Sequence, residues 1–402
     1  MLSLAAMLAV ISYASPASAE LKISGDAITR VRGQFRNSSL RDLGGVYQKN
    51  VYQDDIKYQY RVRLKASADL GDGYFFKTLI ANEENTLQGG TPGWNTVGNT
   101  NSEKFQLEVS NFYFGRMMES SHYMIGRLPL NSFNNPIFDI TLYPVPAYGF
   151  TNSSIYAVDV PVFQWNYDRV YGMNYGTKVG NGELNATLVV LDNNSVKEDT
   201  TINTGDGVFN DGYLLHLSYK TTIGDVTVEP QAIITLTDAQ GASYQKISPN
   251  TFGANATIPV GKSKLGLSGF YTVCKDSKGA TGTTYSSTTT LDNSTIVTSP
   301  WATVDYSAYL LRLKGESGPV MAWIDYNRTN DNSRTATKST DITYNNIFVW
   351  AQYKINVHES ALGSVSVIPT VRYRASGRDI AGIAGTGHNN ELRPELWASV
   401  TF

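Results

Sequence analysis

The chain has 402 residues, of which 33 are Lys or Arg and 35 are Asp or Glu, so its formal net charge is −2. This balance gives no global attraction to nucleic acid, and an electrostatic role must come from where the charges lie. The single cysteine, Cys274, excludes an internal disulfide. Beyond its first residues the chain has no uncharged apolar run of roughly 20 residues, which excludes an inner-membrane protein built from helices.

The beginning of the chain has the pattern of an export signal. An apolar run from Leu2 to Tyr13 is followed by the small residues Ala17 to Ala19, which are typical of a cleavage site. We therefore expect a secretory signal peptide at residues 1–19, with Glu20 as the first mature residue. No Lys or Arg precedes the apolar run, which leaves open a start upstream of Met1.

Two long segments of alternating character open the mature chain. Over residues 21–36 and again over 56–69, apolar or small residues occupy every second position, and charged or polar residues lie between them. Strands in soluble domains average about 5 to 6 residues, whereas a tilted membrane strand needs about 9 to 11. A strand with lipid on one side and water on the other alternates in this way. Length and pattern together predict membrane strands.

The same alternation continues to the end of the chain. It predicts further strands at about 73–82, 104–117, 122–130, 161–179, 183–192, 211–222, 226–237, 249–260, 264–275, 301–314, 319–328, 342–357, 364–376 and 392–402. Pro230, Pro369 and Pro394 fall inside these strands, where each removes a ladder donor.

The connections between these strands alternate strictly between short and long. Outer-membrane barrels have this order, with short periplasmic turns and long extracellular loops. We therefore predict an all-β fold: one transmembrane antiparallel β-barrel over residues 20–402, with about sixteen strands and both ends in the periplasm. The segment 162–177 has room for another hairpin, so about eighteen strands is the alternative.

The chain resembles the bacterial porins in its export signal, alternating strands, loop order and C-terminal Phe402. The segment from Tyr123 to Leu130, with Gly126 and Arg127, is similar to the one before the inward-folded loop of many porins. The resemblance implies a water-filled outer-membrane channel for passive diffusion of small solutes, usually a homotrimer. It also implies that the loop 131–159 folds inward and narrows the lumen; Asp139 and Asp159 are its candidate acidic groups.

The resemblance further implies contacts with outer-membrane lipid and lipopolysaccharide. Phe402 would be the signal read by the barrel-assembly machinery of a Gram-negative cell. Neither nucleic acid, a metal nor a cofactor is expected as a partner.

The strongest candidate site is basic. Its members lie on the predicted water-facing sides of the first two and last two strands, which are neighbours in a closed barrel: Arg30, Arg32, Lys57, Arg61, Arg63, Lys65, Arg372, Arg374 and Arg393. Walls of Arg and Lys lower the barrier for anions, so the lumen is predicted to prefer them. The alternative is that these residues pair with Asp26, Asp69 and Glu395 and merely fill the wall.

Two other functions stay open. Tryptophans along the lumen would form a stacking track for a saccharide-selective porin, and the candidates are Trp165, Trp323, Trp350 and Trp397. A barrel of this kind could also be a sheath around a multihaem cytochrome. An enzyme is not expected, because the four histidines are scattered and the only nearby pair of a histidine with a serine is His216 with Ser218.

Overall fold

The computed structural model describes residues 20–41, 47–82, 94–97, 107–137, 169–192, 212–237, 249–276, 302–332, 334–335, 341–383 and 387–402. Nearly all of them lie in strands and turns, and a short 3-10 helix, η2 (Leu130–Phe133), follows one strand. Within these ranges, no helix is both long enough and apolar enough to cross a bilayer.

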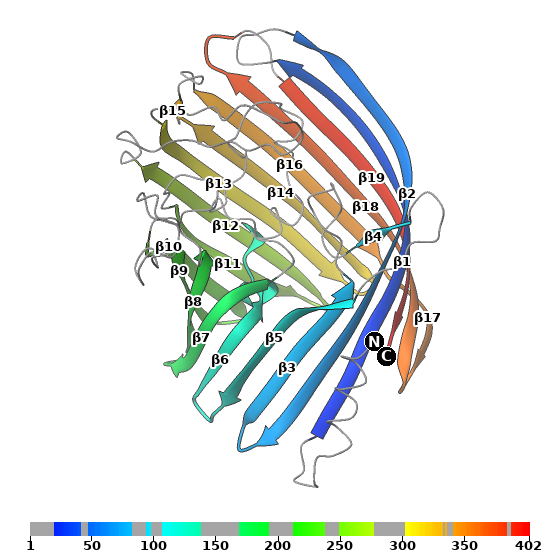
Figure 1. The fold of residues 1–402 in the computed structure, drawn as a ribbon, viewed down its shortest axis with the longest axis vertical. Helices are drawn as coiled ribbons and strands as arrows, with labels where there is room; N and C mark the ends of the chain where they lie inside the picture. Colours follow the sequence, from blue (N-terminus) through cyan, green and yellow to red (C-terminus); the bar gives the residue numbers. More distant parts are fainter. Residues whose placement is uncertain are drawn as a thin grey trace, which may run out of the picture.

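The strands form one antiparallel sheet that closes on itself (Figure 1). They are β1 (Glu20–Arg41), β2 (Tyr47–Gly71), β3 (Tyr74–Asn82), β4 (Asn95–Thr96), β5 (Leu107–Met117), β6 (Ser121–Pro129), β7 (Arg169–Val179), β8 (Gly182–Asp192), β9 (Gly212–Ile223), β10 (Val226–Thr235), β11 (Asn250–Val260), β12 (Ser263–Asp276), β13 (Ala302–Ser317), β14 (Val320–Asp331), β15 (Arg334–Thr335), β16 (Ile342–Tyr353), β17 (Ile355–Ser360), β18 (Gly363–Ile380) and β19 (Gly387–Thr401).

The barrel wall has sixteen strand positions, which confirms the predicted fold. The segments β16 and β17 share one position because both pair with β18, and β4 and β15 are two-residue additions. The wall therefore closes without the extra hairpin of the eighteen-strand alternative. The strand predicted from residue 161 is described only from Arg169.

The barrel closes where β1 meets β19. Gly25 and Phe402 form the end of this seam: the Gly25 N–H donates to the Phe402 carbonyl at 2.7 Å, and the Phe402 N–H donates back at 3.1 Å. A Cβ on Gly25 would lie 2.7 Å from the Phe402 ring and 2.6 Å from the Arg63 carbonyl oxygen. Only glycine leaves room for the terminal ring at this place.

Pro230, Pro369 and Pro394 coincide with gaps in the ladders. The β9–β10 pairing skips Pro230, the β1–β19 pairing skips Pro394, and the pairing of β18 with β16 and β17 skips Pro369. Proline has no N–H to donate, so the ladder on its side is interrupted. The same effect explains why the strand predicted over 342–357 breaks at Lys354, beside Pro369.

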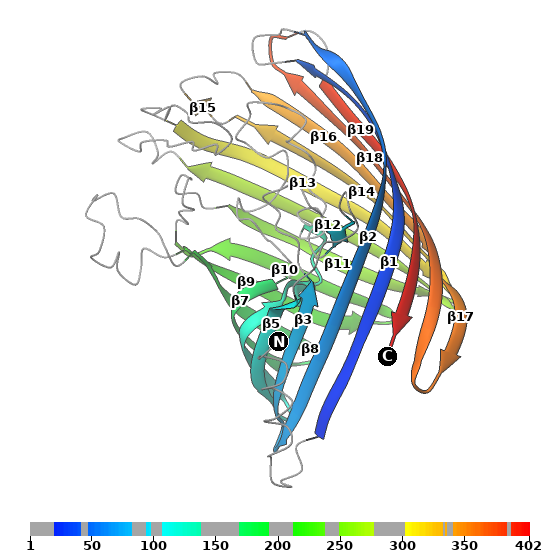
Figure 2. The ribbon, with the colours of Figure 1, turned by 45° about the vertical axis from the view of Figure 1, so that its right-hand side comes forward.

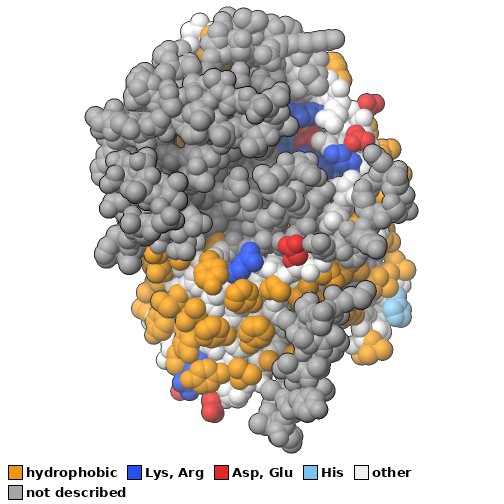
Figure 3. Space-filling model, in the orientation of Figure 1, with side chains coloured by type: hydrophobic (Ala, Val, Ile, Leu, Met, Phe, Trp, Pro, Cys, Tyr) orange, Lys and Arg blue, Asp and Glu red, His pale blue; other side chains and the backbone are white. Residues whose placement is uncertain are grey.

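The two faces of the wall differ in chemistry. On β19, Leu392, Leu396 and Val400 point outward and are 41%, 52% and 45% exposed, whereas Glu391 and Glu395, each just before an outward leucine, are 6% and 5% exposed. Figure 3 shows hydrophobic side chains gathered over the outer wall around β3 and β5. An outward apolar face is the pattern of a strand that borders lipid.

The strands differ greatly in length around the wall. β1 has 22 residues and β2 has 25, whereas β3 and β6 have 9 each. Figures 1 and 2 show the consequence: β1, β2, β18 and β19 rise together as one tall side of the barrel. This tall side carries all nine residues of the predicted basic site.

Candidate pore-wall site

The predicted arginines lie on the inner face of the tall side. In β1 and β18 they alternate with outward residues, and Arg30, Arg32, Arg372 and Arg374 are 2%, 3%, 3% and 5% exposed. Register brings them together, because Arg372 is opposite Arg393 on β19 and Arg32 is opposite Glu395. The closed barrel thus joins residues from the two ends of the chain.

Glu395 is the centre of this cluster. Its Oε2 atom lies 3.3 Å from Arg30 Nη1 and 3.1 Å from Arg372 Nη2, and its Oε1 atom lies 3.7 Å from Arg32 Nε. Trp397 Nε1 donates to Oε2 at 2.7 Å. One carboxylate with a fully buried side chain therefore holds two guanidinium groups by charge-assisted hydrogen bonds, which fix their directions, and has a third within ion-pair distance.

Two further carboxylates extend the network. Asp26 accepts from Arg63, whose Nη2 lies 2.8 Å from Asp26 Oδ2, and Arg61 Nε lies 3.9 Å from Asp26 Oδ1. Glu391 pairs with Arg393 at 2.6 Å. We call the whole set the arginine network, and its members are Asp26, Arg30, Arg32, Arg61, Arg63, Arg372, Arg374, Glu391, Arg393 and Glu395.

The two predicted lysines lie beside this network. Lys57 is half-buried opposite Arg32, and Lys65 is exposed opposite Ser24. The alternative expected the basic residues to pair with Asp26, Asp69 and Glu395. The ion pairs with Asp26 and Glu395 are present. Asp69 instead accepts from the Gly71 N–H at 3.0 Å in a turn.

Indole rings form a continuous row across the same wall. Trp323 stacks on Trp350 at 4.7 Å, Trp350 meets Trp397 edge-on at 6.0 Å, and Trp397 meets Trp94 at 5.3 Å. The Arg372 guanidinium lies 3.9 Å above the Trp350 ring. Both faces of Trp350 are therefore covered. The predicted Trp165 lies outside the described residues.

Gly126 and Arg127 of the predicted motif lie on different faces of the wall. Gly126 has φ +133°, and a Cβ there would lie 2.4 Å from the Phe112 carbonyl oxygen. Arg127 pairs with the outward residue Tyr171, and its Nη1 donates to the Val109 carbonyl at 3.2 Å. Arg127 thus belongs to the outer side of the wall.

The chain after this motif turns into the barrel. Asn135 Nδ2 donates to Gln231 Oε1 at 3.0 Å, and Asn255 Nδ2 donates to the Asn134 carbonyl at 2.6 Å. Gln231 and Asn255 are inward residues of β10 and β11. Residues 130–137 therefore lie against the inner wall, and Asp139 and Asp159 lie outside the described residues.

A small apolar patch on the inner wall receives this segment. Phe133 packs in a cluster with residues of β6 to β10: Leu128, Val170, Val189, Leu214 and Ile233. The sequence carries a signal for this patch: pairs of consecutive apolar residues, which break the alternation, occur on three adjacent strands at 189–190, 214–215 and 233–234.

His216 has a role in the same place. Its ring stacks on Phe133 at 4.2 Å between ring centroids, and its Nε2 atom lies 3.2 Å from Gln231 Oε1. The histidine therefore helps to hold the inward segment.

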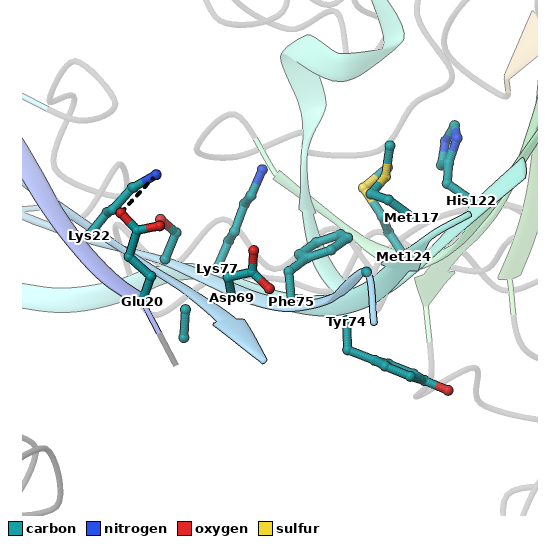
Figure 4. Close-up of a pocket in the computed structure, with 12 residues that line it drawn as sticks. Glu20, Lys22, Asp69, Tyr74, Phe75, Lys77, Met117, His122 and Met124 are labelled. Atoms are coloured by element: carbon teal, nitrogen blue, oxygen red, sulfur yellow. Dashed lines mark ion pairs between the residues drawn. The ribbon is translucent and has the colours of Figure 1, made fainter. Parts of the chain in front are cut away.

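A pocket of about 500 Å³ opens at the rim where the short turns lie. Figure 4 shows Lys22, Lys77, Phe75 and His122 on one side of the sheet, with Tyr74 turned to the other. Lys22 is paired with Glu20 at 3.3 Å, so the charges in this pocket are of both signs.

Comparison with known proteins agrees with the fold. No family profile matches the chain, and no curated protein does. Among solved structures, the outer membrane channel DcaP of Acinetobacter baumannii is similar over 97% of this chain and 99% of its own, with 13% identity and a TM-score of 0.50. The fold is that of an outer-membrane β-barrel. The anion-selective porin from Comamonas acidovorans covers 95% of this chain and 100% of its own, with 14% identity and a TM-score of 0.49.

Proposed function

We propose that this chain forms a water-filled channel in the outer membrane of a Gram-negative bacterium, through which small hydrophilic solutes diffuse passively with a preference for anions. The observation that carries this function is the arginine network on the inner face of a wall whose outer face is apolar. A closed wall of this kind has no open sheet edge, as a bilayer requires, and leaves its polar side to water.

The anion preference rests on the balance of charge in the arginine network. Its arginines outnumber its carboxylates, which are Asp26, Glu391 and Glu395. The ion pairs cancel part of the positive charge and fix the guanidinium groups, but an excess remains on one side of the lumen. Low-dielectric walls focus such a field and raise the local concentration of anions.

The inward segment favours a channel over a sheath. Residues 130–137 contact the inner faces of β10 and β11, so they take up space that a multihaem partner would need. In our proposal, the rest of the loop 131–159 continues inward and brings Asp139 and Asp159 toward the arginine network. The lumen would then be narrowed and crossed by a transverse field.

A saccharide channel has less support. The row of indoles is present, but Trp350 is covered by Arg372 on one face and Trp323 on the other. A sugar cannot stack on a ring in that state.

The remaining parts of the proposal concern delivery and assembly. We propose export by the signal peptide at residues 1–19 and insertion through the C-terminal strand that ends in Phe402. The mature protein would be a homotrimer in contact with lipid and lipopolysaccharide, without catalytic activity.

The test is the current through the purified barrel in a planar bilayer, with the reversal potential measured in a salt gradient. We expect stable open channels that favour anions. The variant with Arg372→Gln and Arg374→Gln should shift the reversal potential toward cations. Arg116→Gln is the control, because Arg116 lies at the short-turn end of β5, away from the arginine network, with its Nε bonded to the Asp72 carbonyl. Inserted barrels without current would contradict the channel, and a cation preference would contradict the selectivity.

A further inference from the structure

The loop between β3 and β5 places an indole on the arginine network. Trp94 is only 4% exposed, with the Arg30 guanidinium carbon 3.7 Å from its ring centroid and that of Arg61 at 4.8 Å. Trp397 touches the same ring edge-on. Two cations of the wall are thus covered by one neutral side chain from a loop, in a cation–π arrangement that attracts each cation to the ring.

A short strand holds Trp94 in place. Beyond Asn82, where β3 ends, β4 takes over the free edge of β2, with Thr96 opposite Gln59 and Asn95 opposite Tyr60. The Asn82 side-chain amide donates to Asn95 Oδ1. The neighbouring Val97 N–H donates to the Tyr58 carbonyl at 2.9 Å. The segment 94–97 is therefore part of the wall and not only a contact on its surface.

Gln59 links this segment to the arginine network. Its Oε1 atom accepts from Arg30 Nε at 2.9 Å and from Arg30 Nη2 at 2.6 Å, while its Nε2 atom donates to Thr96 Oγ1 at 3.0 Å. One amide side chain thus fixes both Arg30 and the strand that carries Trp94. The guanidinium group and the docked segment therefore share one hydrogen-bond partner.

We propose that Trp94 is a selectivity-determining residue, which covers Arg30 and Arg61 and so limits both the width of the lumen and its attraction for anions. This inference rests on the proposed channel function. The indole takes up volume on the inner face of the wall and lies against two positive charges. Without it, both guanidinium groups would lose this apolar cover and attract anions more strongly.

The first experiment replaces the indole. Trp94→Ala should raise single-channel conductance and shift the reversal potential further toward anions. The shift should be larger in dilute salt than near 1 M, where the screening length is about 3 Å. Trp94→Phe keeps a ring over Arg30, so its conductance and reversal potential should lie between those of the unmodified channel and those of Trp94→Ala. Tyr271→Ala is the control, because Tyr271 is an outward aromatic that is 49% exposed.

A second experiment separates two effects of Trp94→Ala: loss of the ring that covers Arg30 and Arg61, and release of the loop that carries it. Tyr60 and Asn95 are directly opposite, so cysteines at these positions, in a Cys274→Ser background, can lock β4 onto β2 under oxidation. The locked channel should conduct like the unlocked one. Adding Trp94→Ala to the locked channel should still raise conductance and anion preference, because the segment stays docked while the ring is missing.

Two outcomes would overturn the inference. One is a Trp94→Ala barrel that folds, as judged by its heat-modifiable mobility on a gel, and has unchanged conductance and reversal potential. The other is an effect that disappears in the locked channel, which would assign it to loop release. Both are distinct from failure of the proposed function, in which the unmodified barrel itself carries no current or favours cations.

Discussion

Phe133 and His216 lie face to face inside the barrel, with ring centroids 4.2 Å apart and an angle of 15° between the planes. Phe133 comes from the segment that turns inward after β6, and His216 comes from the inner face of β9. The contact joins the start of the proposed constriction loop to β9 of the barrel wall.

Removing this contact should release the inward segment. Phe133→Ala leaves a cavity among Leu128, Val189 and Leu214, and a change of this type costs on the order of 3 kcal/mol. We expect larger and noisier single-channel currents and faster proteolytic cleavage near residue 133. Phe114→Ala is the control, since Phe114 is an outer residue that is 52% exposed. Equal currents and equal cleavage in both variants would show that the contact does not hold the loop.

Glu395 should be the most sensitive carboxylate of the arginine network. Glu395→Gln removes the charge shared by Arg30, Arg32 and Arg372, and breaking a buried ion pair in this way costs about 3 to 5 kcal/mol. We expect the barrel to unfold at lower temperature and its reversal potential to move further toward anions.

The control for this change is Glu316→Gln. Glu316 pairs with Lys314 at 2.7 Å, but both side chains are well exposed, and such pairs contribute about 0 to 1 kcal/mol. Thermal unfolding followed by gel mobility compares the two variants. A Glu395→Gln barrel as heat-resistant as the Glu316→Gln barrel would show that the network does not depend on this carboxylate.

The seam should not accept a side chain at Gly25. Gly25→Val places its Cβ against the Phe402 ring and the Arg63 carbonyl, and overpacking of this kind costs about 1 to 3 kcal/mol. We expect slower folding into detergent micelles and less folded barrel. Gly315→Val is the control, because a Cβ there meets nothing within 4 Å. If both variants fold at the same rate, the seam has more room than the contacts indicate.

Restoring a donor at Pro369 should repair the break between β16 and β17. Pro369→Ala offers an N–H toward the Lys354 region, and a net hydrogen bond contributes about 0.5 to 1.5 kcal/mol. We expect slower hydrogen exchange around residues 353–355 and a small rise in the unfolding temperature. Unchanged exchange there would mean that the break has another cause than the missing donor.

The alternation of side chains made much of this barrel predictable. A strand has a side-chain period of two, so a charged residue that alternates with apolar ones can lie only on the water side of the wall. For this reason Arg30, Arg372 and Arg393 could be placed together from closure alone. The ion pairs between these arginines and Glu395 could also be expected from the sequence, because Glu395 lies on the same face of the wall.

The loop contributions could not be predicted in this way. Trp94 lies in a long polar stretch without periodicity, and nothing local indicates that it returns to pair with β2. The inner apolar patch was overlooked for a related reason: the doublet at 189–190 places one residue on each face, and the pattern reads as a defect until the loop that covers Val189 is known.

The unequal strands give the barrel a bevelled end. About 9 to 11 residues of a tilted strand suffice to cross the apolar layer, so roughly half of β1 and β2 stands beyond it. At β3 and β6 the described strands stop close to that layer. Among the described residues, the edge of the wall is therefore high at β1 and β2 and low at β3 and β6. Every strand that carries the arginine network belongs to the side that extends beyond the apolar layer.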